Sequence, residues 1–298
     1  MLGLCCQFMV PKKNSNVYYN VSEEKNLQLN QFINNKYSKE RILDTWKNNI
    51  SGFLKILKHA VNDKIYSVRM SSNILPMWDK LDYLHENQEV DNLFKTVGLF
   101  AKEHNIRITC HPDIWCVLNS DSQSVIDNSI NQLKYHAFMF DKMSLSQTNY
   151  NLINVHGGKR NNLAQLIKTI NTLPDNIKNR LTLENDERSF SVKQLHEVHK
   201  ETGVSLVFDI HHHSFNQDSL SAQEAVELCQ STWKEKPLFH LSNTEPGNES
   251  GSFSDRRKHS QFIHYIDPYF LSLIKEDKID CDIEAKQKNL AISDLRKK

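Results

Sequence analysis

Glycine and proline are scarce in this sequence, with 8 glycines and 7 prolines among 298 residues. Loops that cradle phosphate groups in nucleotide-binding folds need closely spaced glycines, and the chain has no such stretch. A linker rich in proline, glycine and serine is also missing. We therefore expect a single domain over residues 1–298 that does not bind phosphate through a glycine-rich loop.

Long apolar runs are missing too, because no stretch approaches the roughly 18 to 20 apolar residues that a membrane span requires. The first residues, MLGLCCQFMVPKK, have their apolar part before their positive charges, unlike a signal peptide, and predict a first β-strand. No CxxC pair is present, and the cysteines are Cys5, Cys6, Cys110, Cys116, Cys229 and Cys281. We interpret them as buried small hydrophobic residues in a reduced, intracellular setting (cytoplasm, nucleoid or nucleus) without a membrane partner.

An excess of charge of one sign is also absent, since the formal net charge is +1. A nucleic-acid enzyme often carries more positive charge, so the sum argues against a DNA partner. Three local clusters remain, at Lys12–Lys13, Lys159–Arg160 and Arg256–Lys258. They fit either solvated loops or parts of a groove that follows phosphates, because such a groove depends on local charge.

Short β-type runs alternate with helical patterns along the whole chain. The predicted strands are residues 2–8, 65–70, 106–111, 151–156, 180–184, 204–209, 237–242 and 279–284. The predicted helices are residues 39–60, 88–104, 123–143, 161–172, 191–202, 221–232 and 260–275, with a last helix after Glu284. Eight such units close most economically into a (β/α)8 TIM barrel, and an open doubly wound α/β sheet is the alternative. Residues 11–38 are expected to form a long loop inserted after the first strand.

Side chains able to bind a metal lie at or near the ends of six consecutive predicted strands. They are His111, His156, Glu184, Asp209, His240 and Glu284. In a barrel the carboxyl ends of the strands meet at one mouth, so these residues would gather there. Carboxylates and imidazoles crowded together are costly to bury without a cation. The pattern therefore predicts bound divalent metal.

Imidazole and carboxylate ligands without a thiolate favour zinc, manganese or iron. Glu184, on the middle strand, is placed to bridge two ions about 3.5 to 4 Å apart. Alternation along a strand cannot direct all three histidines of FDIHHH the same way. We therefore expect His212 to be a ligand and His211 or His213 to support it.

A set of short motifs runs through nearly the whole chain. They are RMSSNILP (69–76), HPDIWCVLNS (111–120), NVHGGK (154–159), LENDE (183–187), FDIHHH (208–213), W…HLS (233–242), HSQFI (259–263) and IEAKQK (283–288). In combination they resemble the UV damage endonucleases, which are (β/α)8 barrels related in fold to endonuclease IV. The combination of ENDE, DIHHH and EAK is specific, whereas each piece alone is not.

The resemblance implies a DNA repair enzyme that cuts double-stranded DNA immediately 5′ of a damaged nucleotide, such as a UV photoproduct or an abasic site. It implies a monomer with two or three divalent ions, manganese first and zinc or magnesium as alternatives. The implied ligand sets are His111, His156 and Glu184; Glu184, Asp209, His240 and Glu284; and His212 with His259. The implied catalytic residues are Glu184, Asp209, Glu284 and Lys286.

Further residues are expected to contact the DNA. Arg69, Ser71 and Ser72 are candidates for phosphate oxygens, and for Arg69 a structural ion pair is the alternative. Trp115 and Gln7 are candidates for the lesion, where an indole stacks on an exposed base.

Three residues are expected to support the ligands from outside. They are Asn185, Asp186 and His211, and ordinary turn residues are the alternative for the first two. Lys286 is expected to reach the site, with a solvent-facing lysine as the alternative.

The chain departs from the family's pattern at several positions. Leu4 stands in place of a tyrosine, and Ile114 in place of a glutamine of the lesion-probing loop, so lesion range is open. Leu238 replaces a common lysine, Gln261 replaces an aspartate, and MWDK (77–80) lacks a histidine. These changes weaken the third ion's site most.

Two other functions are compatible with the sequence. A metal-dependent sugar isomerase or epimerase would use the same barrel and the same ions on a hydroxy-carbonyl substrate. A non-catalytic DNA-binding relative would fit the departures near the third ion. The basic clusters favour the nuclease over the isomerase, and the retained acids argue against loss of activity.

Overall fold

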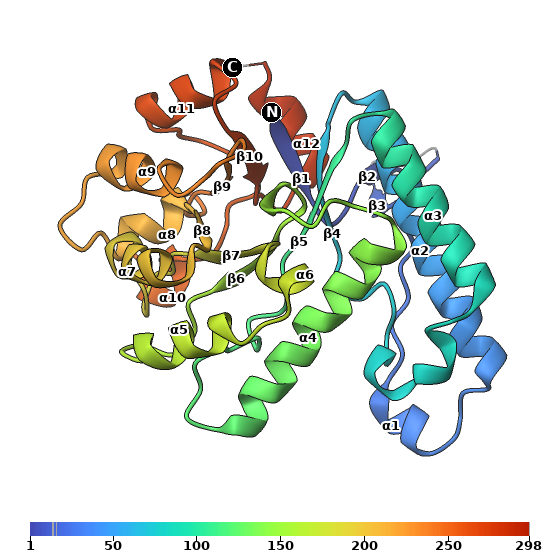
Figure 1. Cartoon of the computed structure of the whole chain (residues 1–298). Coiled ribbons are helices and arrows are strands. Elements are labelled where there is room, and N and C mark those ends of the chain that lie inside the picture. Colours follow the sequence, from blue (N-terminus) through green and yellow to red (C-terminus); the bar gives the residue numbers. More distant parts are fainter. Residues whose placement is uncertain (14, 16, 298) are drawn as a thin grey trace.

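The computed structural model describes residues 1–13, 15 and 17–297. The other three positions, of which 14 and 16 belong to the loop expected at 11–38, lie outside the described residues. Eight parallel strands form one sheet in the order β8-β7-β6-β5-β4-β1-β10-β9 (Figure 1). The strands are β1 (Leu2–Cys5), β4 (Ser67–Met70), β5 (Arg107–Cys110), β6 (Ile153–His156), β7 (Leu181–Glu184), β8 (Ser205–Val207), β9 (Leu238–Leu241) and β10 (Asp280–Ile283).

The two edges of this sheet meet, which closes the barrel. Asp209, just after β8, forms a parallel bridge with His240 of β9, and the His240 amide donates to the Phe208 carbonyl at 2.9 Å. The (β/α)8 barrel is therefore confirmed, and the open sheet is excluded. Each predicted strand is present, although each is one to three residues shorter than expected.

Helices surround the strands (Figure 1). The longer ones are α2 (Lys39–Asn62), α3 (Gln88–Glu103), α4 (Gln123–Lys142), α5 (Leu163–Asn171), α7 (Val192–Thr202), α9 (Ala222–Gln230), α11 (Pro268–Lys275) and α12 (Lys288–Leu295). Sequence explains their positions: α2 starts after Ser38, whose hydroxyl accepts from the Arg41 amide at 3.2 Å, and it buries an apolar face that includes Trp46 and Phe53. Among the described residues, no helix is both long and apolar enough to cross a membrane.

The prediction of a helix at residues 260–275 was wrong for its first half. Helix α11 begins only at Pro268, because the Asp267 carboxylate accepts from the amides of Tyr269 and Phe270 and so caps the helix there. Proline in the first turn fits this start, since its missing N–H has no helical partner to lose. Residues 260–267 form no helix, and the carbonyls of Ser260 and Gln261 instead accept from the amides of Lys286 and Gln287.

Shorter elements lie in the connecting segments. They are α1 (Leu29–Ile33), α6 (Asp175–Lys178), α8 (Ile210–Phe215), α10 (Phe253–Arg256) and the 3-10 turns η1 (Trp78–Lys80), η2 (Asp82–Leu84) and η3 (Asn149–Asn151). The expected 11–38 loop contains structure of its own, because β2 (Met9–Pro11) and β3 (Tyr18–Asn20) pair antiparallel. Asn289 of α12 bonds both the amide and the carbonyl of Met9, which fixes this hairpin to the barrel.

Candidate metal centre

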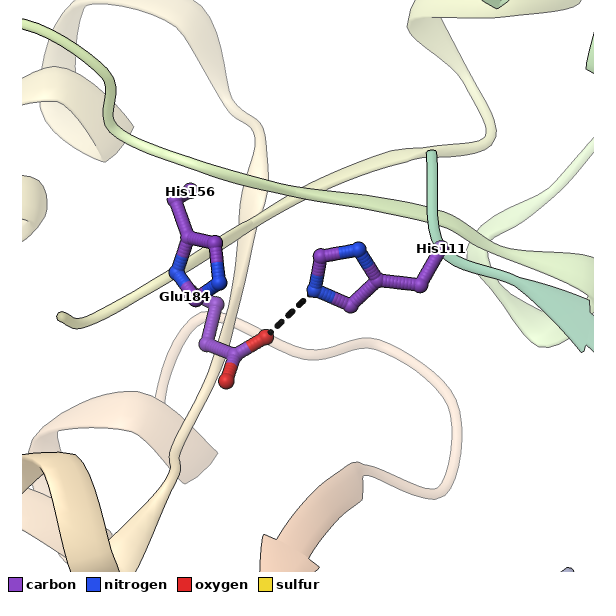
Figure 2. Close-up of side chains that lie close together, drawn as sticks. All are labelled: His111, His156 and Glu184. Carbon is purple, nitrogen blue, oxygen red and sulfur yellow. Dashed lines mark hydrogen bonds and ion pairs between the residues drawn. The ribbon is translucent and has the colours of Figure 1, made fainter. Parts of the chain in front are cut away.

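The six strand-end residues predicted from the sequence come together at the barrel mouth. With His212 they form three groups whose ligand atoms lie within 4.8 Å of one another. The groups are His111, His156 and Glu184; Glu184, Asp209 and His212; and Asp209, His240 and Glu284. Figure 2 shows the first of them, with the rings of His111 and His156 beside the Glu184 carboxylate. Each group shares a carboxylate with the next.

Glu184 is the centre of this cluster and is 1% exposed. Its Oε2 lies 3.1 Å from His111 Nε2 and also accepts from the Asn154 amide. Its Oε1 lies 3.1 Å from His240 Nδ1 and 3.3 Å from His212 Nδ1. The two oxygens therefore face different groups of ligands, as a bridging carboxylate requires. Sequence reasoning missed Asn154, although it lies two residues before His156 on the same face of β6.

The charges of the cluster depend on one another. Burial raises the pKa of Glu184, but His240 and His156 together with the other histidines outweigh it, so the pKa lies well below its usual range. Burial lowers the pKa of His212, but Asp209 and Glu184 reverse this and hold the pKa well above its usual range. The pKa of Glu184 is thus lowered chiefly by the positive charge of neighbouring histidines, and a bound cation would lower it in the same way.

The three consecutive histidines lie in helix α8 and not on a strand, so the expected alternation was wrong. The Asp209 carboxylate accepts from the His212 amide at 2.8 Å and thereby starts the helix. The helix turns His212 toward Glu184 and Asp209. His213 points elsewhere, with Nε2 3.1 Å from the Leu220 carbonyl. His211 packs on other rings, edge to face with that of Phe215.

Arg69 lies inside the barrel rather than at its rim, with 10% of its side chain exposed. It donates to Asp282 at 3.1 Å and to Glu284 Oε1 at 2.5 Å, and its Nη2 lies 2.8 Å from His240 Nε2. Burial raises the pKa of Glu284, but Arg69 and His240 outweigh it and lower the pKa. Gly3 leaves room for this network, because a Cβ there would overlap with Asp282 Oδ1. Arg69 is thus the ion pair that the sequence left as the alternative.

Asn185 and Asp186 directly follow Glu184, and their side chains bond different parts of the backbone. The Asn185 side chain donates to the Asp209 carbonyl and accepts from its amide, both at 2.9 Å, so it holds the end of β8 next to β7. Asp186 accepts from the amides of residues 188–190 and so stabilises a turn. Asn185 therefore positions a ligand-bearing segment, and Asp186 is a turn residue.

Comparison with known proteins decides which family this architecture belongs to. The family model of UV-endonuclease UvdE matches residues 1–298. The chain belongs to the UV-endonuclease UvdE family. It is 36% identical over 239 residues to a UV DNA damage endonuclease of Nostoc sp. (strain PCC 7120 / SAG 25.82 / UTEX 2576), a match that covers 76% of this chain and 70% of that protein.

Solved structures agree with this assignment. The crystal structure of SacUVDE superposes with a TM-score of 0.81 and 28% identity, covering 97% of this chain and 94% of that one. A D-psicose 3-epimerase determined in the presence of D-fructose reaches a TM-score of 0.52 at 15% identity, with 78% of each chain covered. At that identity the epimerase shares the fold alone.

The residues that the UvdE resemblance assigns to the lesion lie on the surface. Trp115 is 72% exposed and Ile114 is 70% exposed, at the tip of the segment that follows β5. Gln7 is also exposed, just beyond the end of β1. The lesion-contact residues implied by the resemblance are thus accessible to a ligand from solvent.

The serines assigned to phosphate contacts have protein partners instead. Ser71 donates to the Glu24 carboxylate at 2.9 Å, and Ser72 donates to the His111 carbonyl at 2.9 Å. The second contact ties the segment after β4 to a residue of the metal cluster. Both hydroxyls can still accept a further bond.

Two residues from the implied UvdE site lie at its margin. His259 Nδ1 is 3.7 Å from Glu284 Oε2, and its side chain is 31% exposed. Within the described residues it belongs to none of the three groups. Lys286 is exposed, with Nζ 3.4 Å from the Glu245 carboxylate, which is outside the groups.

The departures from the UvdE pattern have a structural counterpart. Leu238 is fully buried in a small apolar cluster with Leu152 and Val207. Gln261 pairs with Gln287 at 3.0 Å. Neither position contributes to the three groups of candidate ligands.

Proposed function

We propose that this chain is a metal-dependent DNA repair endonuclease that hydrolyses the phosphodiester 5′ of a damaged nucleotide. The observation that carries the proposal is the row of three overlapping ligand groups at the mouth of a UvdE-family barrel. The residues fit divalent ions. Within the described part of the chain, Asp209 Oδ2 and His156 Nδ1 are buried and have no hydrogen-bond partner. Such orphaned atoms are what a metal would use, and a donor set of imidazoles and carboxylates suits manganese or zinc.

The arrangement assigns roles to the residues of this chain. Glu184 and Asp209 each belong to two groups, so they would hold neighbouring ions close together. When bound, such ions lower the pKa of a water nucleophile and neutralise charge on the phosphate and the leaving oxygen. Asn185 keeps Asp209 in place through two backbone bonds. No covalent nucleophile is required, and we retain Glu184, Asp209 and Glu284 as the residues closest to the reaction.

The surroundings suit a polyanion. A cavity of about 620 Å³ adjoins the metal cluster, with His156 and His212 among its lining residues. The same cavity is lined by more cations than acids, namely Lys159, Arg188, Arg257 and Lys258 against Asp186 and Glu187. Cations next to a metal cluster attract the phosphate backbone and hold it in register. The proposed partner is therefore double-stranded DNA, in spite of the small net charge.

Trp115 offers a test of lesion contact. Because its ring is exposed next to the mouth, we expect Trp115→Ala to weaken binding to lesion-containing duplex by about 1 to 3 kcal/mol, the usual cost of losing one stacked base. Fluorescence anisotropy with UV-irradiated and undamaged duplexes would measure it. Ile114→Ala is the matched control, since it removes a neighbouring exposed side chain that has no aromatic face. An equal loss of affinity in both variants would show that Trp115 contacts the DNA without stacking on a base.

A nicking assay tests the whole proposal. The protein is stripped with a chelator, reloaded with Mn²⁺, Zn²⁺ or Mg²⁺, and incubated with UV-irradiated, abasic or undamaged duplex labelled at one end. We expect nicks 5′ of the lesion only after reloading. The same preparations are offered D-psicose and D-fructose. Sugar conversion without nicking would establish the epimerase alternative, and metal-independent DNA binding with neither reaction would establish the non-catalytic one.

A further inference from the structure

Two arginines near the mouth lie over phenyl rings. Arg188 Cζ is 4.5 Å from the centre of the Phe253 ring, and Arg256 Cζ is 5.4 Å from the centre of the Phe215 ring. The two phenyl rings touch edge to face, with their centres 5.4 Å apart. We call Arg188, Phe215, Phe253 and Arg256 the Arg–Phe ledge. It joins α8, α10 and the segment after β7.

The ledge arginines differ from the other cations nearby. Lys159 is paired with Asp121, and Arg257 is paired with Glu187 at 2.5 Å. No carboxylate in the described ranges lies within ion-pair distance of Arg188 or Arg256. A guanidinium that lies over a ring keeps its N–H groups available while the ring limits its motion. Within the described ranges, the ledge therefore presents two positive charges that are not held in an ion pair.

A row of ring contacts fixes the ledge relative to the metal cluster. Phe215 meets His211 edge to face at 5.1 Å, and His211 meets His259 edge to face at 5.9 Å. His259 lies 3.7 Å from a Glu284 oxygen. Arg188 also lines the cavity that contains His156 and His212, which are both candidate ligands. The ledge thus has two arginines outside any described ion pair, rings that restrict their motion, and a place next to the candidate ligands.

We propose that the Arg–Phe ledge is a phosphate clamp that holds the backbone of the cut strand beside the phosphate to be hydrolysed. The proposal rests on the proposed function, since it takes DNA as the partner. A guanidinium fork binds two oxygens of one phosphate, and two adjacent forks suit neighbouring phosphates of a chain. The clamp reads no bases, so it acts equally on damaged and undamaged DNA.

Binding measured without metal tests the clamp. Duplex DNA, with and without a lesion, is titrated with the full chain in EDTA, and anisotropy is followed from 50 to 200 mM salt. At 0.1 M salt we expect Arg188→Ala and Arg256→Ala each to weaken binding about eightfold on both duplexes. Log K decreases as log salt increases, and this decrease should be less steep by about 0.9 in each variant, because binding releases one counterion fewer.

Two further variants separate charge from geometry. Phe253→Leu keeps every charge but removes the ring under Arg188, so we expect a smaller loss of affinity, about threefold, with an unchanged slope. Lys200→Ala removes a cation of α7 that is paired with Glu197, away from the cavity, and we expect less than a twofold change. Circular dichroism confirms that each variant is folded.

The outcomes separate the clamp from the proposed function. Wild-type affinity and slope in both Arg→Ala variants would overturn the clamp, and so would an equal loss in Lys200→Ala. Because binding is measured in a chelator, it does not depend on cleavage. A chain that loses affinity as expected but never nicks DNA would keep the clamp and overturn the endonuclease.

Discussion

Replacing Glu184 with glutamine is expected to abolish DNA cleavage, with a loss of at least about a thousandfold in kcat/KM. The reason is that Glu184 belongs to two of the three ligand groups and its two oxygens face different sets of histidines. An amide of the same shape cannot supply the negative charge that Glu184 would offer to the ions of two neighbouring groups. Loss of roughly 4 kcal/mol of transition-state stabilisation corresponds to this factor.

The matched control is Glu245→Gln, which makes the same chemical change at a rim residue that pairs with Lys286. We expect the control to cut DNA at nearly the wild-type rate and the Glu184 variant to bind fewer ions by elemental analysis. Circular dichroism should be unchanged in both, since the barrel layers below the mouth supply stability. A Glu184→Gln variant that still cuts at a tenth of the wild-type rate would contradict the proposed site.

Replacing Arg69 with methionine is expected to destabilise the fold by about 3 to 5 kcal/mol, the usual cost of breaking a buried ion pair from one side. Arg69 is the cation that contacts both Asp282, which is fully buried, and Glu284. Without it, two carboxylates inside the barrel lose their counter-charge. Urea unfolding in a chelator measures the loss, because any metal ion would otherwise add its own stabilisation.

Two additional variants make this expectation specific. Adding Asp282→Asn to Arg69→Met removes the charge that the first change left unpaired, so the double variant should be more stable than Arg69→Met alone. Gly3→Ala should also destabilise, because its Cβ would overlap with Asp282 Oδ1 and so displace the carboxylate that pairs with Arg69. If Arg69→Met lost less than about 1 kcal/mol of stability and instead weakened DNA binding, Arg69 would be a phosphate ligand as first considered.

The gathering of the candidate metal ligands was predictable because it follows from barrel geometry. Parallel strands aim their carboxyl ends at one mouth, so a metal-capable residue at each strand end is sufficient to place His111, Glu184 and Asp209 together. The position of each candidate ligand follows from the local pattern of its own strand. Closure of the barrel then brings the strand ends, and with them the ligands, together.

The features that were not predicted depend on long-range contacts or on a local competition. Arg69 pairs with Asp282, which is 213 positions away in the sequence, and no local pattern predicts this partner. After Asp209 the chain could extend as a strand or turn into a helix. The Asp209 carboxylate favours the helix, because it accepts from the His212 amide and so caps the first turn. The contact between Phe215 and Phe253 likewise joins two short helices that are far apart in the chain.

Anomalous diffraction from crystals soaked in Mn²⁺ tests the central claim most directly, because it locates ions without relying on activity. The account predicts anomalous peaks at the barrel mouth, one between His111, His156 and Glu184 and another beside Asp209 and Glu284. The absence of any peak there at saturating Mn²⁺, with ions bound only at surface carboxylates, would contradict it.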